Sequence, residues 1–359
     1  MLSWRTTIQA VFSLTLMAWA IPVSSGSNGI HIMIEFQGNV RVKKAQWKDF
    51  HQAKYGITLS GEDKIELRGN ASVRIYCSNQ NQWTVKQPGT YLVSEGCPEG
   101  EPVIKSCPDC NNDKLRPFGT KEEKLKQLPY LISPRHTLVF NESLTFRWNE
   151  VPGAREYTVR VGDWERKTQE TQIVYDGELE PGKFYDVRVV ADNKMASTDE
   201  DDGQYSWFIV LEEEEAKTLE ERVGAIERLE NPEGEGLVLA YFYRGNELNA
   251  EAIQVLEGLI ESGSQTTTVY QLLGDIYRQV GLSLMAKEVY QQGLALTVEE
   301  EMSEVKAMMQ WGLGVVEYLL GNRDEAAEWL EKARVNYLAL GKQLNKEEEK
   351  LINQILGGN

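Results

Sequence analysis

Residues 270–290 read YQLLGDIYRQVGLSLMAKEVY, and this stretch decides the fold of the C-terminal part of the chain. Apolar and small residues recur in it three and four positions apart, which is the spacing of an amphipathic α-helix. Gly281 lies between the two periodic halves, so the stretch predicts a pair of helices joined by a short turn. One such pair cannot bury its apolar face alone, and neighbouring pairs must stack against it.

The same pattern recurs before and after this stretch. Ala252, Ala286 and Ala326 begin equivalent second helices, so the spacing is 34 and then 40 residues. These segments closely resemble the tetratricopeptide repeat (TPR), which has a 34-residue period. The resemblance implies an all-α TPR solenoid within a helical domain at 212–359, with about three repeats and a capping helix at 344–356. The chain at 212–230 is also predicted to be helical, with Asn231 and Pro232 ending that helix.

Arrays of this family bind extended peptides or partner helices along a concave surface that the first helix of each pair lines. Carried over by position, the resemblance implies a partner groove at Tyr241, Arg244, Gln271, Asp275, Arg278, Trp311, Val315 and Tyr318. In that groove Trp311 beside Tyr318 would be an apolar anchor, and the arginines would be charged contacts. The alternative is that Trp311 packs against the turn inserted in the third repeat, and that the arginines only balance the negative charge of nearby acidic residues.

The N-terminal part has a β pattern instead. Short alternating or β-branched runs separated by turn residues predict a small all-β domain at 26–98. The order GNVRV at 38–42, LSGEDKI at 59–65 and NASVRIY at 70–76 resembles the FecR-type β-domain, with Glu62 as an insertion. That family's domain lies in the periplasm and serves signalling or recognition, and none of its members' partners can be transferred to this chain.

A polar linker at 99–130 contains cysteine and proline, and a second β pattern follows at 131–211. LTFRW at 144–148, a Pro-Gly turn and YTVRV at 157–161 resemble a fibronectin type III domain, an immunoglobulin-like β-sandwich. The resemblance implies a core position for Trp148 and a tyrosine corner at Tyr185, whose hydroxyl caps nearby backbone. The chain is therefore predicted to be multidomain, with two different β-domains before the helices.

Residues 1–25 have the pattern of a signal peptide. Arg5 precedes an apolar run, and Ala18-Trp19-Ala20 supplies a small-x-small cleavage pattern. The apolar run is shorter than the roughly 18–20 residues that a bilayer-spanning helix needs. We expect an exported chain in the periplasm, the cell envelope or the extracellular space, with no membrane insertion after cleavage.

An exported chain explains the four cysteines, Cys77, Cys97, Cys107 and Cys110, as structural disulfides. Three pairings are open, and the favoured one joins Cys77 to Cys97 and Cys107 to Cys110. The Cys-Pro-Asp-Cys spacing also fits a redox pair or half of a zinc site. Its flanks are loop-like, however, and the other two cysteines are too far apart for usual zinc-ligand spacing. The sequence therefore predicts no metal and no cofactor.

The charge and the histidine content limit the classes of function that the sequence supports. The chain has 38 basic and 55 acidic residues and a net charge of −17, which argues against binding to nucleic acid. The three histidines, His31, His51 and His136, lie in separate segments and suggest no catalytic triad, so no enzyme is predicted. The prediction is a non-enzymatic exported adaptor that binds a protein partner through the TPR groove in the cell envelope, with β-domains that could contact an envelope polymer. The alternatives are a FecR-type envelope sensor or regulator and, more weakly, an uncharacterised enzyme.

Overall fold

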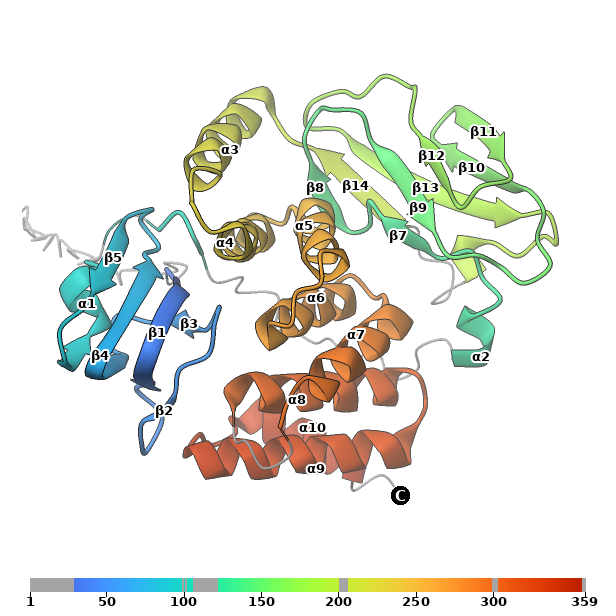
Figure 1. The fold of residues 1–359 in the computed structure, drawn as a ribbon. Helices are drawn as coiled ribbons and strands as arrows, with labels where there is room; N and C mark the ends of the chain where they lie inside the picture. Colours follow the sequence, from blue (N-terminus) through green and yellow to red (C-terminus); the bar gives the residue numbers. More distant parts are fainter. Residues whose placement is uncertain are drawn as a thin grey trace, which may run out of the picture.

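Figure 1 shows the computed structural model of the protein, in which two β regions lie on different sides of a group of helices. The structure describes residues 29–98, 100, 102–105, 122–199, 206–298 and 303–356. The predicted signal peptide, Cys107 and Cys110 lie outside the described residues.

The first β region, here called the N-terminal sheet, has six strands with the order β2-β1-β4-β5, while β3 pairs with β1 and β6 pairs with β4. Its elements are β1 (His31–Lys43), β2 (His51–Gln52), β3 (Thr58–Leu59), β4 (Lys64–Tyr76), β5 (Gln82–Val85), β6 (Gly89–Leu92) and the short helix α1 (Val93–Gly96). All of its strand pairs are antiparallel.

Gly69 and Asn70 are turn-favouring residues, and on that basis the sequence predicts two strands, 63–67 and 71–77; the structure corrects this, because β4 runs unbroken from Lys64 to Tyr76. Gly38 in β1 and Gly69 in β4 both have left-handed backbone conformations, with φ of 74° and 63°. The β1–β4 register shifts beside Gly38, so the two glycines lie at the same level of the ladder. They bend both strands as a bulge does, and neither strand reverses direction.

The second β region consists of two sheets over a shared core. One sheet has the order β11-β10-β13-β14-β8 and the other β12-β9-β7. Their elements are β7 (Leu131–Ser133), β8 (Thr137–Val139), β9 (Thr145–Trp148), β10 (Tyr157–Val161), β11 (Trp164–Thr168), β12 (Gln172–Val174), β13 (Phe184–Ala191), the 3₁₀ turn η1 (Ser197–Asp199) and β14 (Ser206–Val210).

Two expectations for this region are confirmed. Trp148 is 2% exposed and lies in the core between the sheets. The backbone N–H of Glu180 donates to the hydroxyl of Tyr185 over 2.9 Å, which is the contact expected of a tyrosine corner. Membership of the fibronectin type III family stays a prediction.

The helices that follow form three consecutive antiparallel pairs, α4 with α5, α6 with α7, and α8 with α9. The short helix α2 (Glu122–Leu125) precedes the second β region, and the helices after it are α3 (Glu213–Ile226), α4 (Pro232–Gly245), α5 (Asn249–Glu261), α6 (Thr267–Gln279), α7 (Ser283–Ala295), α8 (Glu304–Leu319), α9 (Arg323–Leu340) and α10 (Lys346–Leu356). Within the described residues, no helix is long and apolar enough to span a bilayer.

Asn231 and Pro232 begin a helix instead of ending one. Helix α3 ends at Ile226, and the side-chain oxygen of Asn231 accepts hydrogen bonds from the N–H groups of Glu233 and Gly234. Pro232 then occupies the first helical position, where its missing N–H is not needed. The sequence prediction placed the correct break but assigned it to the wrong helix end.

One continuous hydrophobic core joins the N-terminal sheet to the helices. Ile32, Ile34 and Tyr76 of the sheet share it with buried residues of α4, α6 and α7. Met33 points into a separate core inside the sheet, so the start of β1 is covered on both faces. The helical array therefore packs against the N-terminal sheet through apolar contact, which is the dominant stabilising term in such packing.

Candidate functional site

The first helices of the three pairs, α4, α6 and α8, carry the eight predicted groove residues, and we call the surface that these residues form the inner wall. Asp275 of α6 is its polar centre. Its Oδ2 accepts from Nε2 of Gln271 over 2.6 Å, and its Oδ1 accepts from the hydroxyl of Tyr290 over 2.6 Å. The guanidinium of Arg244 lies 3.6 Å from Oδ2. Asp275 is 7% exposed, so its carboxylate is held by the array's own side chains.

Tyr241 and Arg278 are also enclosed. Burial has the largest effect on the Tyr241 hydroxyl and raises its pKa. The charge of Arg244 has the next largest effect and lowers it. Nε of Arg278 donates to the hydroxyl of Tyr290 over 3.4 Å, and Arg278 is 9% exposed. These two side chains are therefore part of the packed helix interfaces in this structure.

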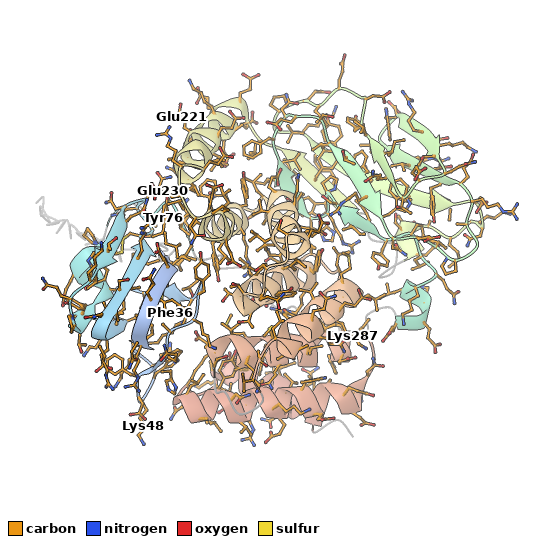
Figure 2. The ribbon with its side chains drawn as sticks, viewed as in Figure 1. Phe36, Lys48, Tyr76, Glu221, Glu230 and Lys287 are labelled. Carbon is orange, nitrogen blue, oxygen red and sulfur yellow. A yellow bond between two sulfur atoms is a disulfide. The ribbon has the colours of Figure 1, made fainter. Side chains whose placement is uncertain are left out.

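The N-terminal sheet covers part of the inner wall. The hydroxyl of Thr268 donates to the backbone carbonyl of Tyr55 over 2.7 Å, and Nδ2 of Asn231 donates to the carbonyl of Ile34 over 3.2 Å. Lys44 forms an ion pair with Glu304 at the start of α8. The backbone of Lys48, labelled at the lower edge of the sheet in Figure 2, donates to the carbonyl of Leu340 over 3.4 Å.

Helix α10 covers the part of the inner wall that belongs to α8. Val315 is fully buried and Tyr318 is 8% exposed, and both pack against Leu351, Ile352 and Ile355 of α10. Trp311 is half-buried and contacts the apolar clusters on both sides of it, including Leu344. The predicted capping helix is thus present, and it removes the expected apolar anchor from the open surface.

What stays open on the inner wall is a hollow of about 210 Å³, here called the inner cleft. Tyr241, Arg244, Gln271 and Asp275 line one side, and residues of the N-terminal sheet and α8 line the rest. The structure brings these four predicted residues together, whereas Arg278, Val315 and Tyr318 lie elsewhere under cover. Partner binding by the eight residues stays a prediction, and in this conformation an extended segment has no open path along them.

The cysteine prediction is confirmed where the structure describes it. Cys77 and Cys97 form a disulfide that closes a loop of 20 residues. His31 lies beside them, and these three residues are the only set of three potential metal ligands close together in the described part of the chain. Because the two sulfurs are bonded to each other, they cannot act as thiolate ligands. Nδ1 of His31 accepts from the N–H of Ser78 over 3.0 Å, and burial lowers the pKa of His31.

Residues 267–297 match the family model of the tetratricopeptide repeat, and this segment corresponds to α6 and α7. The match confirms the repeat prediction for that pair. No curated protein matches the chain. For the pairs α4–α5 and α8–α9, membership of the same family stays a prediction. Their helix lengths and their pairing agree with it.

Sequence reasoning missed one hollow entirely. A pocket of about 900 Å³ lies between the second β region and helices α3, α4 and α5, and acidic side chains from three separate segments line it. Each of those segments is acidic in the sequence, but nothing in their spacing indicates that they meet.

Proposed function

We propose that this protein is a non-enzymatic scaffold of the cell envelope that binds a protein partner. The match of α6 and α7 to the tetratricopeptide repeat carries the proposal, because repeats of this kind typically hold proteins together and perform no chemistry. The predicted signal peptide and the disulfide between Cys77 and Cys97 support export, since such bonds persist in oxidising compartments.

The contacts of the inner wall give the scaffold a specific form. Its helices hold the N-terminal sheet through Thr268 and Asn231, and they hold the second β region through the turn before α5. There the hydroxyl of Thr137 and the N–H of Leu138 donate to the carbonyl of Glu247 over 3.0 Å each. Two β regions are thereby fixed to one helical array, which is the arrangement of a multi-armed scaffold.

The size of the inner cleft limits what a partner inserts there. Ligand pockets for whole small molecules enclose roughly 300–1,000 Å³, and the inner cleft holds about 210 Å³. Ile57, Val305 and Met308 give it apolar sides, whereas Gln271 and Asp275 give it a polar floor. We therefore infer that a partner inserts one large side chain and makes its other contacts on the surrounding surface.

Site-specific photo-crosslinking in the native cells tests this proposal. A photoreactive phenylalanine analogue replaces Met308 in the full chain, and a matched chain carries it at the exposed Glu170 of the second β region. We expect one discrete crosslinked protein at position 308 and none of that protein at position 170. Crosslinks of equal yield at both positions, or none at 308, would contradict the proposal.

A blocking variant adds an independent readout. Met308→Trp fills the inner cleft and is expected to reduce capture of the crosslinked protein by the purified full chain at least about tenfold. Glu170→Trp, which adds the same side chain to the exposed turn between β11 and β12, is expected to leave capture unchanged. Circular dichroism of both variants checks that each retains its fold.

A further inference from the structure

The pocket between the second β region and helices α3, α4 and α5 is strongly acidic, and we call it the acidic pocket. It encloses about 900 Å³. Six carboxylates line it, from Glu142, Glu220, Glu227, Glu251, Glu257 and Glu261. Among the described residues that line it, Arg147 is the one with a cationic side chain. A low-dielectric hollow with charge of one sign concentrates ions of the opposite sign.

This cationic side chain, Arg147, already forms an ion pair within the chain. The guanidinium of Arg147 lies 2.7 Å from Oε2 of Glu257, and the hydroxyl of Tyr277 also donates to this carboxylate. Within the described part of the chain, no ion pair joins a cation to any of the other five carboxylates of the acidic pocket. Among the described residues, the acidic pocket therefore has an excess of carboxylates that no cationic side chain pairs with.

Glu251, in the first turn of α5, shows this excess most clearly. Its carboxylate is almost wholly removed from solvent, although the residue as a whole keeps some exposed surface. Its Oε2 atom is buried and has no hydrogen-bond partner. A buried carboxylate oxygen without a partner is costly, because it has lost its hydrogen bonds to water and gained none in return. A carboxylate in this state that lines a pocket is where a cationic ligand gains most.

Glu142, between β8 and β9, is the charged residue that acts on Glu251 from across the acidic pocket. Burial raises the pKa of Glu251 to about 7, helped by Glu142 and opposed by N–H groups of Glu251 and Phe140. Across the pocket, burial together with Glu251, Glu227 and Glu142 raises the pKa of the Tyr243 hydroxyl to about 12. In both groups burial is the main cause of the raised pKa, and carboxylates that face the same space add to it.

The spacing of the carboxylates distinguishes between kinds of cation. A bound Ca²⁺ needs six to eight oxygens within about 2.6 Å of the ion, so its ligand atoms lie close together. In the described residues, the only group of three potential ligand atoms within 4.8 Å of one another is His31, Cys77 and Cys97, far from this pocket in the fold. The carboxylates of the acidic pocket are therefore too dispersed to chelate one metal ion. A ligand with several positive groups along a chain matches dispersed carboxylates.

We propose that the acidic pocket binds an organic polycation, a ligand that carries several ammonium groups along a flexible chain. Its volume lies within the range of small-molecule pockets. One ammonium group pairs with the carboxylate of Glu251, and others pair with Glu142 and Glu227. A free linear polyamine and a lysine-rich peptide both present this chemistry. The site shares no residue with the inner cleft, so it stands independently of the proposed scaffold function.

Calorimetric titration of the full chain with spermidine at low ionic strength and pH 8 tests the proposal. We expect saturable binding to one site. The triple variant Glu142→Gln, Glu227→Gln, Glu251→Gln is expected to weaken binding at least about tenfold. A control with the same change in net charge, Glu150→Gln, Glu170→Gln, Glu178→Gln, alters three exposed residues of the second β region and is expected to change affinity less than about twofold.

Proton release supplies a second readout that a general acidic field would not produce. At pH 7 the carboxyl of Glu251 is partly protonated, and an ammonium group favours its ionised form. Spermidine binding should therefore release protons near pH 7, measured from the heats in two buffers of different ionisation enthalpy. Glu251→Gln alone, which keeps the side-chain shape and so preserves the fold, should abolish this release.

The remaining titrations assign or overturn the site. Tetralysine that binds more tightly than spermidine identifies a lysine-rich peptide as the ligand, and the reverse order identifies a free polyamine. Calcium chloride binding with spermidine inactive would overturn the proposal. Equal losses in the triple variant and its charge-matched control would also overturn it, because binding would then reflect the net charge alone.

Discussion

The hydroxyl of Thr268 donates to the backbone carbonyl of Tyr55 over 2.7 Å, although 213 positions of the chain separate the two residues. Thr268 lies in the first turn of the helix pair that matches the tetratricopeptide repeat, and Tyr55 belongs to the loop that leads into β3 of the N-terminal sheet. Beside this bond, Gly56 lies against Thr268 and Leu237. The β region therefore contacts the helices at the place where a repeat array would receive a foreign segment.

Gly56→Ala should loosen this contact. Gly56 has a φ of +73°, and an added Cβ would lie 2.8 Å from Cδ1 of Leu237 and 3.1 Å from Cγ2 of Thr268. We expect the free energy of unfolding to fall by about 1–3 kcal/mol, measured by urea denaturation. Gly153→Ala is the control, because Gly153 has a φ of +82° and no atom near its Cβ position. An equal loss in both variants would assign the effect to the backbone angle alone.

Gly312→Ala should disrupt the helix packing around Tyr290. Tyr290 is fully buried, and Cβ atoms added at Gly274 and Gly312 would lie 2.5 Å and 2.3 Å from its ring. Overpacking of this kind costs about 1–3 kcal/mol, measured as a lower thermal midpoint. Gly258→Ala, on α5 with nothing near the added methyl group, should leave stability equal or raise it by up to about 1 kcal/mol. If both variants melt alike, Gly312 does not hold the helices close.

Loss of the disulfide should destabilise the N-terminal sheet. Cys77 follows β4 and Cys97 follows α1, so the bond ties two ends of the sheet across a separation of 20 residues. A loop of this length contributes about 3 kcal/mol by restricting the unfolded chain. The double variant Cys77→Ala, Cys97→Ala should melt at a lower temperature than the oxidised protein. Its response to reductant should be smaller than that of the parent chain, and an unchanged response would contradict the assignment.

Glu251→Gln should change the dependence of stability on pH. Burial raises the pKa of Glu251 from its ordinary 4.5 to about 7, so the folded chain holds this proton more tightly than the unfolded chain. The stability from the protonated group is complete below about pH 4.5 and is lost as the pH rises through 7. Glutamine mimics the protonated form.

The variant should therefore be more stable than the parent at pH 8, by about 1–3 kcal/mol, and nearly equal to it at pH 5. Urea denaturation at the two pH values measures the difference. Glu150→Gln, at an exposed position, is the control and should show no pH-dependent difference. A gain for Glu251→Gln of the same size at both pH values would show that the carboxyl is not buried as an ionisable group.

One signal for the covered inner wall was present in the sequence. A strand with one solvated face alternates apolar and polar residues, whereas Ile32, Met33 and Ile34 are consecutive and apolar. Consecutive apolar residues indicate a strand that is buried on both faces, as β1 is at this end. The pattern indicates that something covers the second face, but it does not identify the helices that do so.

The sequence by itself determined the local features of this protein. Small and apolar residues at helical spacing predicted the pair around Gly281. The resemblance to a fibronectin type III domain implied the corner at Tyr185, and the bond between Cys77 and Cys97 belonged to the favoured one of three pairings. These depend on contacts between neighbours along the chain or on a small set of pairings.

Only the tertiary structure decided which segments face the inner wall and where acidic side chains come together in the acidic pocket. Thr268 meets Tyr55, and Glu251 meets Glu142, because several elements pack together in one particular geometry. Apolar burial depends on area and has no preferred direction, so a sequence that specifies two apolar faces does not state which faces join. The same reason hides the acidic pocket, since an acidic side chain on an exposed helix and one in an enclosed hollow have identical local sequence patterns.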